Sequence, residues 1–352
     1  MNLFKLKESY EAHPYKWWHI PLLLLLIIGT VYIIVTNKPK SSDDITWHQF
    51  EGQIFGTIYH ITYQHNENLD VGISETLTDV DNSLSTFNRN STISAINSNK
   101  SSKTDSRLQE VVKKAIEVSK KTDGAFDITV APFVNLWGFG FQNSTNVTQN
   151  VIDSLKEFVG IKHIKLQDGI LTKKDSRTML DCNAIAKGYG VDAVCNFLQE
   201  NGARAFMVEI GGEVRVCGTN PKGNKWRIGI NEPVDDSLSV NNEIQNVIEV
   251  KDVAMATSGN YRNFYVKDNI KYAHTINPKT GYPVQHTLLS STVLAKDCMT
   301  ADAYATAFMV CGIEKAKNIL QSDTTIKAYF IYSKPDGTNG VWHSEGLNLE
   351  QQ

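Results

Sequence analysis

An uncharged apolar run near the N-terminus divides this chain into two parts of different character. No residue between Trp17 and Asn37 is formally charged, and the centre of the run reads IPLLLLLIIGTVYIIVT (20–36). A membrane-crossing helix needs ~20 apolar residues, and a helix packed in a globular core is rarely apolar on every face. We therefore expect a transmembrane anchor at residues 20–36, after a short cytoplasmic segment (1–19) and before a polar linker (37–47).

A cleaved signal peptide is the alternative to an anchor. No Ala-x-Ala-like cleavage site follows the run, and the absence of any cysteine before Cys182 excludes an N-terminal lipoprotein anchor. Lysines lie on both sides of the run, with a slight excess before it (Lys5, Lys7, Lys16; Lys38, Lys40). This weak positive-inside bias favours a single-pass protein whose large C-terminal part lies outside the cytoplasm.

The remaining chain has the composition of a globular protein. Of its 352 residues 41% are hydrophobic and 21% charged, which allows one large domain or two ordinary ones. The net charge of −3 provides no basic field for nucleic acid, so we expect no nucleic-acid partner. The five cysteines form no CxxC pair and no zinc-finger spacing, and we interpret them as small buried hydrophobic residues.

Helix and strand patterns alternate irregularly after residue 48. Residues 53–64 alternate as a strand does, 106–124 form an amphipathic helix, 163–173 suggest a hairpin turning at Asp168–Gly169, and 205–218 suggest two strands around a double glycine. The absence of a regular βαβ rhythm argues against a Rossmann sheet. Neither GxGxxG nor GxxxxGK[ST] occurs. The pattern predicts a mixed α/β (α+β) fold in a single domain, 48–345.

Two polar stretches contain candidate binding or catalytic residues. DCNAIAKGYGVD (181–192) begins with the capping residues Asp181 and Asn183 and then has Lys187 among small residues, so a helix N-terminus and an amine could bind an anion there. A capped helix with a solvated lysine is the alternative. AHTINPKTGYPV (273–284) places His274 four residues before a Pro-x-x-Gly turn, where it is either a base or a structural histidine.

A third stretch, MTADAYATA (299–307), contains an acid and an alcohol among small residues. Asp302 and Thr306 stand at i and i+4, which places their side chains on one face of a helix. Oxygen ligands of this kind suit a hard cation such as Mg²⁺, which binds few protein groups and then takes substrate phosphate oxygens. An Asp–Thr hydrogen bond on a packed helix is the alternative.

Taken together in their order, these stretches resemble the ApbE family of FAD:protein FMN transferases. The resemblance covers residues 48–340 and rests on the following motifs: GTIYHITY, NSLSTFNRNSTISAIN, GAFDITVAPFVNLWGFG, DCNAIAKGYGVD, VEIGGEVRVCG, ATSGNYRNFY, HTINPKTGYPV and MTADAYATA. It implies a T-fold-like α/β domain that binds FAD and Mg²⁺. It also implies transfer of the FMN moiety of FAD to a Ser or Thr hydroxyl of an acceptor protein, with release of AMP.

The resemblance also implies roles for individual residues. It assigns Mg²⁺ binding to Asp302, to Thr306 and to the backbone carbonyls of Ala184 and Ala305, and a catalytic role to Asp302 and to His274 as the base. Contacts to FAD are implied for Phe55, Phe87, Ala125, Phe126, Asp127, Asp181, Lys187, Arg262 and Ile276. Phe55 stands where many members have Met, Phe87 where many have Tyr, and Asn183 where Gly or Ser is common. No expected metal ligand and no candidate base is missing.

Partners and location follow from the resemblance together with the anchor. The implied acceptors are FMN-binding subunits of sodium-translocating Nqr or Rnf-type electron-transfer complexes, and the implied location is the bacterial inner membrane with the catalytic domain on the periplasmic side. Two other functions fit the same residues. One is an FAD pyrophosphatase, in which water replaces the acceptor hydroxyl; the other is a flavin-binding protein without catalysis.

Overall fold

The computed structural model describes residues 21, 24–30, 46–142, 147–233, 244–260, 264–267, 270–347 and 349. The chain divides into two compact units, Met1–Ile45 and Thr46–Gln352. Among the described residues, no helix combines the length and the apolar character needed to cross a membrane. The expected cytoplasmic segment (1–19), anchor (20–36) and linker (37–47) fall mostly outside the described residues, and the second unit begins close to the boundary expected at residue 48.

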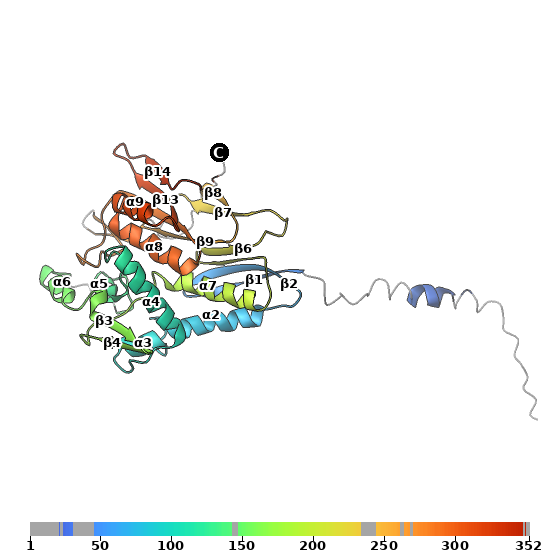
Figure 1. Cartoon of the computed structure of the whole chain (residues 1–352), viewed down its shortest axis with the longest axis horizontal. Helices are drawn as coiled ribbons and strands as arrows, with labels where there is room; N and C mark the ends of the chain where they lie inside the picture. The colour runs from blue at the N-terminus through green and yellow to red at the C-terminus, as the bar shows by residue number, and fades with distance from the viewer. Residues whose placement is uncertain are drawn as a thin grey trace, which may run out of the picture. The chain divides into compact units, whose positions relative to one another are not determined.

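The second unit is built on an eight-stranded sheet (Figure 1). In spatial order its strands are β1 (Thr46–Ile54), β2 (Thr57–His65), β5 (Phe206–Ile210), β6 (Glu213–Cys217), β9 (Val253–Gly259), β12 (Leu288–Ala295), β13 (Lys327–Ser333) and β14 (Asn339–His343). Each strand runs antiparallel to its neighbours. The mixed α/β fold is therefore confirmed, and the sheet is not of the parallel Rossmann kind.

Alternating residues of the central strands are buried on opposite faces of this sheet. In β9, for example, Ala254 and Ala256 pack under helices, whereas Met255 packs under a hairpin. The helices lie against one face and include α2 (Asp70–Leu84), α7 (Ala186–Glu200), α8 (Cys298–Cys311) and α9 (Ile313–Ser322). The hairpin of β7 (Trp226–Asn231) and β8 (Ile244–Val250) covers the other face. Both faces of the central strands are thus buried.

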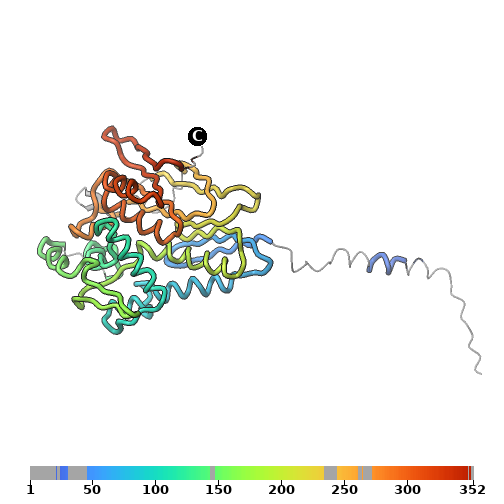
Figure 2. Tube along the Cα trace, viewed as in Figure 1, coloured from blue at the N-terminus to red at the C-terminus, as the bar shows by residue number. Residues whose placement is uncertain are grey.

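The remaining elements include a group of helices and short strands that lies together on one side of this framework, drawn cyan to green in Figure 2. In chain order the remaining elements are α3 (Thr92–Asn97), α4 (Ser106–Lys121), η1 (Ile128–Val130), α5 (Ala131–Leu136), α6 (Gln149–Lys156), η2 (Ile161–His163), β3 (Ile164–Gln167), β4 (Ile170–Lys173), β10 (Phe264–Lys267) and β11 (Ile270–Ala273). The carboxylate of Asp105 joins α2, α3 and α4, because it caps α4 at Leu108 N–H and accepts hydrogen bonds from Ser83 and Thr92.

Several local predictions are confirmed and two are wrong. The hairpin at 164–173 turns at Asp168 and Gly169 as predicted, and the strands around the double glycine form β5 and β6. The predicted strand 53–64 is instead the junction of two strands, because Phe55 and Gly56 adopt positive φ of 52° and 72° and turn the chain back. The predicted capping of a helix by Asp181 or Asn183 is also wrong, because α7 starts at Ala186 and its N-cap residue, Ile185, makes no side-chain capping hydrogen bond.

All five cysteines are free thiols. Cys182, Cys195 and Cys298 are buried, and Cys217 and Cys311 are partly buried. Burial raises the pKa of each of the five thiols, so the neutral form dominates at neutral pH. Their interpretation as small hydrophobic residues is confirmed.

Candidate active site

A cavity of about 1120 Å³ opens among the helices and the sheet of the second unit. Nearly all of the predicted site residues line it: Phe55, Phe87, Ala125, Phe126, Asp127, Asp181, Ala184, Lys187, His274, Ile276, Asp302 and Thr306. Arg262 lies outside the described residues. Ala305 is fully buried in α8 and is not among the lining residues, so its assignment as a metal ligand stays a prediction.

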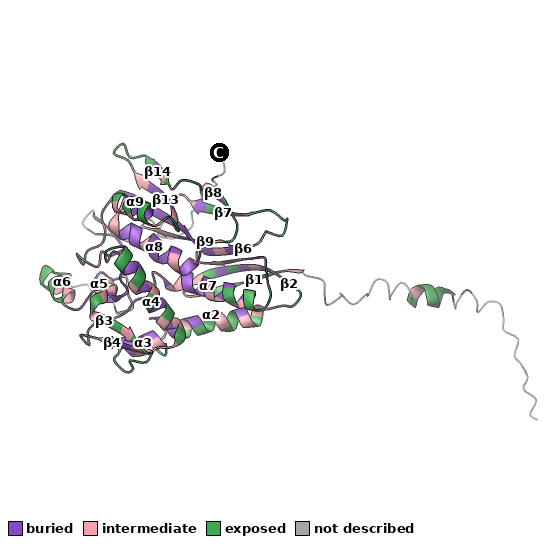
Figure 3. Ribbon diagram, viewed as in Figure 1, coloured by how far each residue is buried: buried purple, intermediate pink, exposed green. Residues whose placement is uncertain are grey.

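Asp302 and Thr306 lie on the same face of α8, as their spacing predicts. The helix is buried along most of its length (Figure 3), and Asp297 caps its first turn by accepting a hydrogen bond from Thr300 N–H. Asp302 is only 2% exposed, and its Oδ2 accepts a hydrogen bond from the Gly188 N–H at 3.0 Å. Thr306 Oγ1 lies 3.0 Å from the Ser258 hydroxyl of β9. Burial raises the pKa of Asp302, while Lys187 and the Gly188 N–H oppose that shift.

The position of α8 depends on its contact with α7. The carboxylate of Asp192 in α7 accepts hydrogen bonds from the N–H groups of Cys298 and Met299, at 3.0 and 2.8 Å, and pairs with Arg215 of β6 at 2.8 Å. At Gly188 the two helices approach so closely that an added Cβ would lie 2.4 Å from the Cys298 carbonyl oxygen. Small residues therefore set the distance between Asp302 and the start of α7.

We expect Gly188→Ala to separate the two helices and to impair the site. The added methyl group overlaps the Cys298 carbonyl and the Asp302 Cβ, and overpacking of this kind costs about 1–3 kcal/mol. Urea unfolding measures the loss of stability. Asn196→Ala, on the exposed side of α7, is the control and should leave the stability unchanged. Wild-type stability in Gly188→Ala would contradict the close contact between the helices.

Lys187 is held by a carboxylate that the sequence analysis did not single out. Its Nζ donates a hydrogen bond to Oε1 of Glu213, the first residue of β6, at 2.5 Å. The Glu213 side chain is 3% exposed and that of Lys187 is 30% exposed. Burial acts to lower the pKa of Lys187, but the charges of Glu213 and Asp302 outweigh it and raise that pKa. Burial also raises the pKa of Glu213, an effect that Lys187 opposes. These three side chains form one electrostatic unit.

Backbone N–H groups hold two further carboxylates of the wall. Asp127 caps η1 and accepts hydrogen bonds from the N–H groups of Thr129 and Ile161, at 2.8 and 2.7 Å. Asp181 accepts one from Asn183 N–H at 2.8 Å. Burial raises the pKa of both carboxyl groups against the effect of these hydrogen bonds. Both residues line the cavity, and their hydrogen bonds to backbone N–H groups also hold the turns in which they lie.

His274 enters the cavity wall from the residue after β11. Its ring makes an edge contact with Phe139, with ring centroids 6.4 Å apart. The predicted turn that follows is confirmed, because Gly281 N–H donates to the Asn277 carbonyl and Gly281 has φ of 79°. Ile276 lies in the same segment and is 5% exposed.

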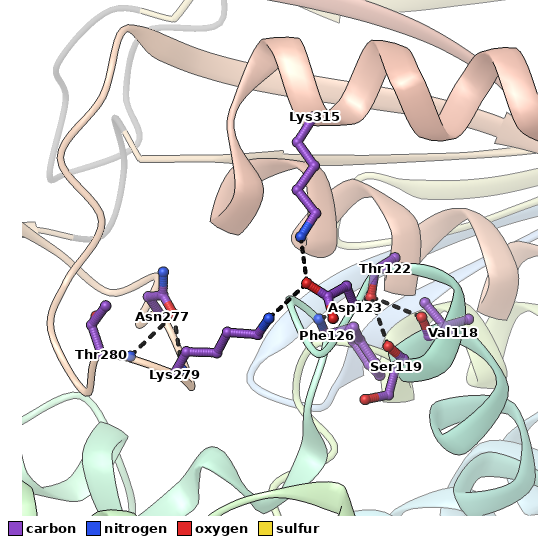
Figure 4. Close-up of polar contacts among 9 residues, drawn as sticks. All are labelled: Val118, Ser119, Thr122, Asp123, Phe126, Asn277, Lys279, Thr280 and Lys315. Atoms are coloured by element: carbon purple, nitrogen blue, oxygen red, sulfur yellow. Dashed lines mark hydrogen bonds and ion pairs between the residues drawn. The ribbon is translucent and has the colours of Figure 1, made fainter.

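An ion-pair cluster joins this turn to the segment before Ala125 and to α9 (Figure 4). Asp123 Oδ2 accepts hydrogen bonds from Lys279 of the turn, at 2.7 Å, and from Lys315 of α9, at 2.9 Å. Asp123 directly precedes the segment that contains Ala125 and Phe126, whereas Lys279 follows His274. The cluster therefore links two segments that line the cavity. The hydrogen bonds from Lys279 and Lys315, together with their charges, lower the pKa of Asp123 to about 2.

Two aromatic residues lie where the resemblance expects flavin contacts. Phe55 stands in the β1–β2 turn, and its ring occupies the space beside Gly190 of α7, 2.7 Å from where a Cβ would be. Phe87 follows α2 and is 65% exposed, with an edge contact to Phe141 at 6.5 Å between centroids. An exposed ring that lines a cavity offers a face on which a planar ligand can stack.

The structure thus brings a carboxylate and a hydroxyl on one helix face, an amine and a histidine together around one cavity. Residues 55–330 match the model of the ApbE family. The chain belongs to the ApbE family.

Similar proteins agree with this assignment. The FAD:protein FMN transferase of Vibrio cholerae serotype O1 is 38% identical over 91% of this chain and 95% of its own length. That of Haemophilus influenzae is 35% identical over 81% and 86%. Among solved structures, the flavin transferase ApbE from Vibrio cholerae matches with a TM-score of 0.77 and 36% identity, covering 86% of this chain and 98% of that one. The apo flavinyl transferase ApbE of Pseudomonas stutzeri matches with a TM-score of 0.76 and 30% identity, covering 86% and 95%.

Proposed function

We propose that this protein transfers the FMN moiety of FAD to an acceptor protein and releases AMP. The observation that carries the proposal is the gathering of Asp302, Thr306, Lys187 and His274 around one cavity, in a chain whose relatives are named for this reaction. The cavity of about 1120 Å³ is larger than most sites for drug-sized ligands, which suits a dinucleotide. The protein is an enzyme, a flavin transferase.

Mg²⁺ fits the two residues that α8 contributes to the cavity with oxygen side chains, Asp302 and Thr306. Asp302 offers a buried carboxylate with one oxygen held by the Gly188 N–H, and Thr306 offers a hydroxyl on the same helix face. Mg²⁺ binds through few protein groups and takes phosphate oxygens as further ligands, so these two oxygen donors suit it. When bound there, Mg²⁺ would neutralise charge on the pyrophosphate and on departing AMP.

The reaction needs a nucleophile, a proton acceptor and a leaving group. We propose that a Ser or Thr hydroxyl oxygen of the acceptor attacks the phosphorus of the FMN half of FAD. A new P–O bond forms, the pyrophosphate P–O bond breaks, and the bridging oxygen leaves with AMP. A ring nitrogen of His274 takes the hydroxyl proton. Lys187 holds the phosphates, and the walls at Phe55 and Phe87 hold the flavin ring. Positioning and charge neutralisation are the main sources of rate in such transfers.

Incubation with FAD, Mg²⁺ and an FMN-binding acceptor domain tests the function directly. We propose acceptors of the Nqr or Rnf type, because the resemblance implies them. Intact mass spectrometry of the acceptor should show the gain of one FMN group, and replacement of the modified Ser or Thr by Ala should abolish the gain. Free FMN beside an unmodified acceptor would identify a pyrophosphatase instead, and no turnover at all would leave only flavin binding.

We expect Lys187→Ala to weaken FAD binding by tenfold or more, since it removes a cation at the proposed phosphate position. It also leaves the buried Glu213 carboxylate without its partner, so the free energy of unfolding should fall. Lys187→Arg is the control because it keeps both the positive charge and a long side chain. It should therefore keep more of the FAD affinity and of the stability than Lys187→Ala does. Isothermal titration with FAD measures the affinity. Wild-type affinity in a folded Lys187→Ala protein would remove Lys187 from the phosphate site.

We also propose that residues 20–36 anchor the protein in the inner membrane with the domain on the periplasmic side. The support is the uncharged run, together with the exposure of Leu24 to Ile28, each more than half exposed in the described helical residues 24–30. Protease added to spheroplasts should digest the domain, and the protein should sediment with membranes. Full protection from protease would overturn the orientation, and a mature N-terminus near residue 40 would overturn the anchor.

A further inference from the structure

The described lining of the cavity is rich in acidic groups. Its carboxylates come from six residues, and its only lysine is Lys187, with no arginine among the described lining residues (the acids are Asp81, Asp127, Asp181, Glu209, Glu213 and Asp302). The substrate that the proposed function assigns, FAD, is itself an anion with a charge on each phosphate group. Ionised carboxylates among these described residues disfavour the pyrophosphate of FAD, and a further cation in the cavity would offset that repulsion.

Glu213 differs from the other acids of the wall. Asp127, Asp181 and Glu209 accept hydrogen bonds from backbone N–H groups, which secure their turns. Glu213 is 2% exposed as a whole residue, its Oε1 accepts the hydrogen bond from Lys187, and its Oε2 is buried without a hydrogen-bond partner. Burial of an incompletely hydrogen-bonded carboxylate costs free energy. Among the described residues Glu213 therefore caps no helix or turn that would account for its position, and the side chain to which it is hydrogen-bonded is that of Lys187.

The pairing changes what Lys187 offers to a substrate. Lys187 forms an ion pair with Glu213, and the charge of Asp302 also acts on its amine. The positive charge expected to bind phosphate is therefore balanced by a carboxylate of the protein itself. A divalent cation at Asp302 and Thr306 would add positive charge beside this pair.

We propose that Glu213 is the counter-ion of Lys187 that makes FAD binding conditional on a divalent cation, so that the cation binds before the dinucleotide. This inference rests on the proposed function, because it takes FAD as the substrate of the cavity. Glu213 is then a positioning residue that acts through Lys187. The positive charge of the cation is the reason why the cation binds before FAD.

Binding to the wild-type protein provides the first test, with no acceptor present and therefore no transfer. FAD and riboflavin are each titrated in EDTA and in saturating MgCl₂, and flavin fluorescence reports binding. Riboflavin contains the flavin ring and ribityl chain without phosphates, so its dissociation constant should not depend on Mg²⁺, whereas that of FAD should fall steeply when Mg²⁺ is added. An equal gain for riboflavin would overturn the inference, because the cation would then act on the protein's structure.

Glu213→Gln provides the second test. It removes one negative charge and keeps the size of the side chain, so FAD should bind in EDTA about tenfold more tightly than to the wild type. Glu209→Gln removes a charge from the same wall, away from Lys187, and should change this affinity much less. Equal affinities of Glu213→Gln and wild type in EDTA, or equal effects of the two variants, would overturn the inference. Melting curves establish whether both variants are folded. If Glu213→Gln does not fold, the comparison of FAD with riboflavin in the wild-type protein is the test that decides whether FAD binding depends on the cation through charge.

These outcomes are distinct from failure of the proposed function. A protein that never modifies an acceptor in Mg²⁺ and FAD would contradict FMN transfer, whatever its binding constants. A protein that transfers FMN, but binds FAD as well in EDTA as in Mg²⁺, would contradict the role of Glu213 alone.

Discussion

Asp302→Ala should abolish FMN transfer. Asp302 is the one carboxylate in the proposed Mg²⁺ site, since Thr306 and the backbone carbonyls are neutral ligands. Its loss removes most of the attraction for the cation, and the pyrophosphate then keeps its charge toward the incoming hydroxyl oxygen. Single-turnover transfer at saturating FAD and high MgCl₂ measures the effect. We expect a rate at or below the detection limit.

The control for Asp302→Ala must separate metal binding from helix packing. The alanine leaves the Gly188 N–H without its acceptor at 3.0 Å, and a buried donor left unpaired costs about 1–3 kcal/mol. Asp302→Asn keeps an oxygen for that N–H and removes only the charge, so it should fold as the wild type does and remain inactive. Near-normal transfer by a folded Asp302→Asn protein would defeat the metal assignment and leave Asp302 as a structural link between α7 and α8.

His274→Ala should slow transfer by about 10²- to 10⁴-fold, the usual effect of removing a general base, while FAD binds as before. Asp302, Thr306 and Lys187 remain in place in this variant, so the affinity for FAD reports an intact cavity. Added imidazole should restore part of the rate, because a small base can enter the space of the missing ring. The readouts are the single-turnover rate with and without imidazole and the FAD dissociation constant.

A histidine remote from the cavity provides the comparison for His274→Ala. His343, exposed at the end of β14, can be replaced by Ala without contact to the lining residues, and its replacement should change neither rate nor affinity. Should His274→Ala transfer FMN at the wild-type rate, or lose FAD binding to the same extent as activity, His274 would be a structural residue of the turn at 277–281.

Local sequence patterns predicted much of this fold because their causes are local. Asp168 and Gly169 both adopt positive φ, which Asp and Gly tolerate, so these two residues are enough to predict the hairpin between β3 and β4. The i, i+4 spacing of Asp302 and Thr306 likewise needs only a helix. The β1–β2 turn was missed because Phe55 is a bulky residue at a φ of 52°, and its ring is accommodated beside Gly190, far away in sequence.

The missed residue of the site, Glu213, depends on tertiary structure. In the sequence Glu213 is one of two charged residues in a short predicted strand. The other, Arg215, forms an ion pair with Asp192 in the structure. Only the antiparallel neighbours of β6 and the approach of α7 bury Glu213 against Lys187. A charge directly after the double glycine, where apolar residues precede and follow, is the one sequence signal of a buried acid. The start of α7 at Ala186 likewise reflects the turn that Asp181 makes with Asn183.

The five unpaired, largely buried thiols bear on where such a domain can mature. Because all five cysteines are free, folding needs no oxidant to form disulfides and no disulfide isomerase to correct their pairing. Thiol–disulfide exchange proceeds through the exposed thiolate, a species that burial suppresses at each of these cysteines. An oxidising extracytoplasmic compartment and the reducing cytosol of an expression host should therefore yield the same polypeptide, which makes biogenesis of the catalytic unit independent of the redox state of its surroundings.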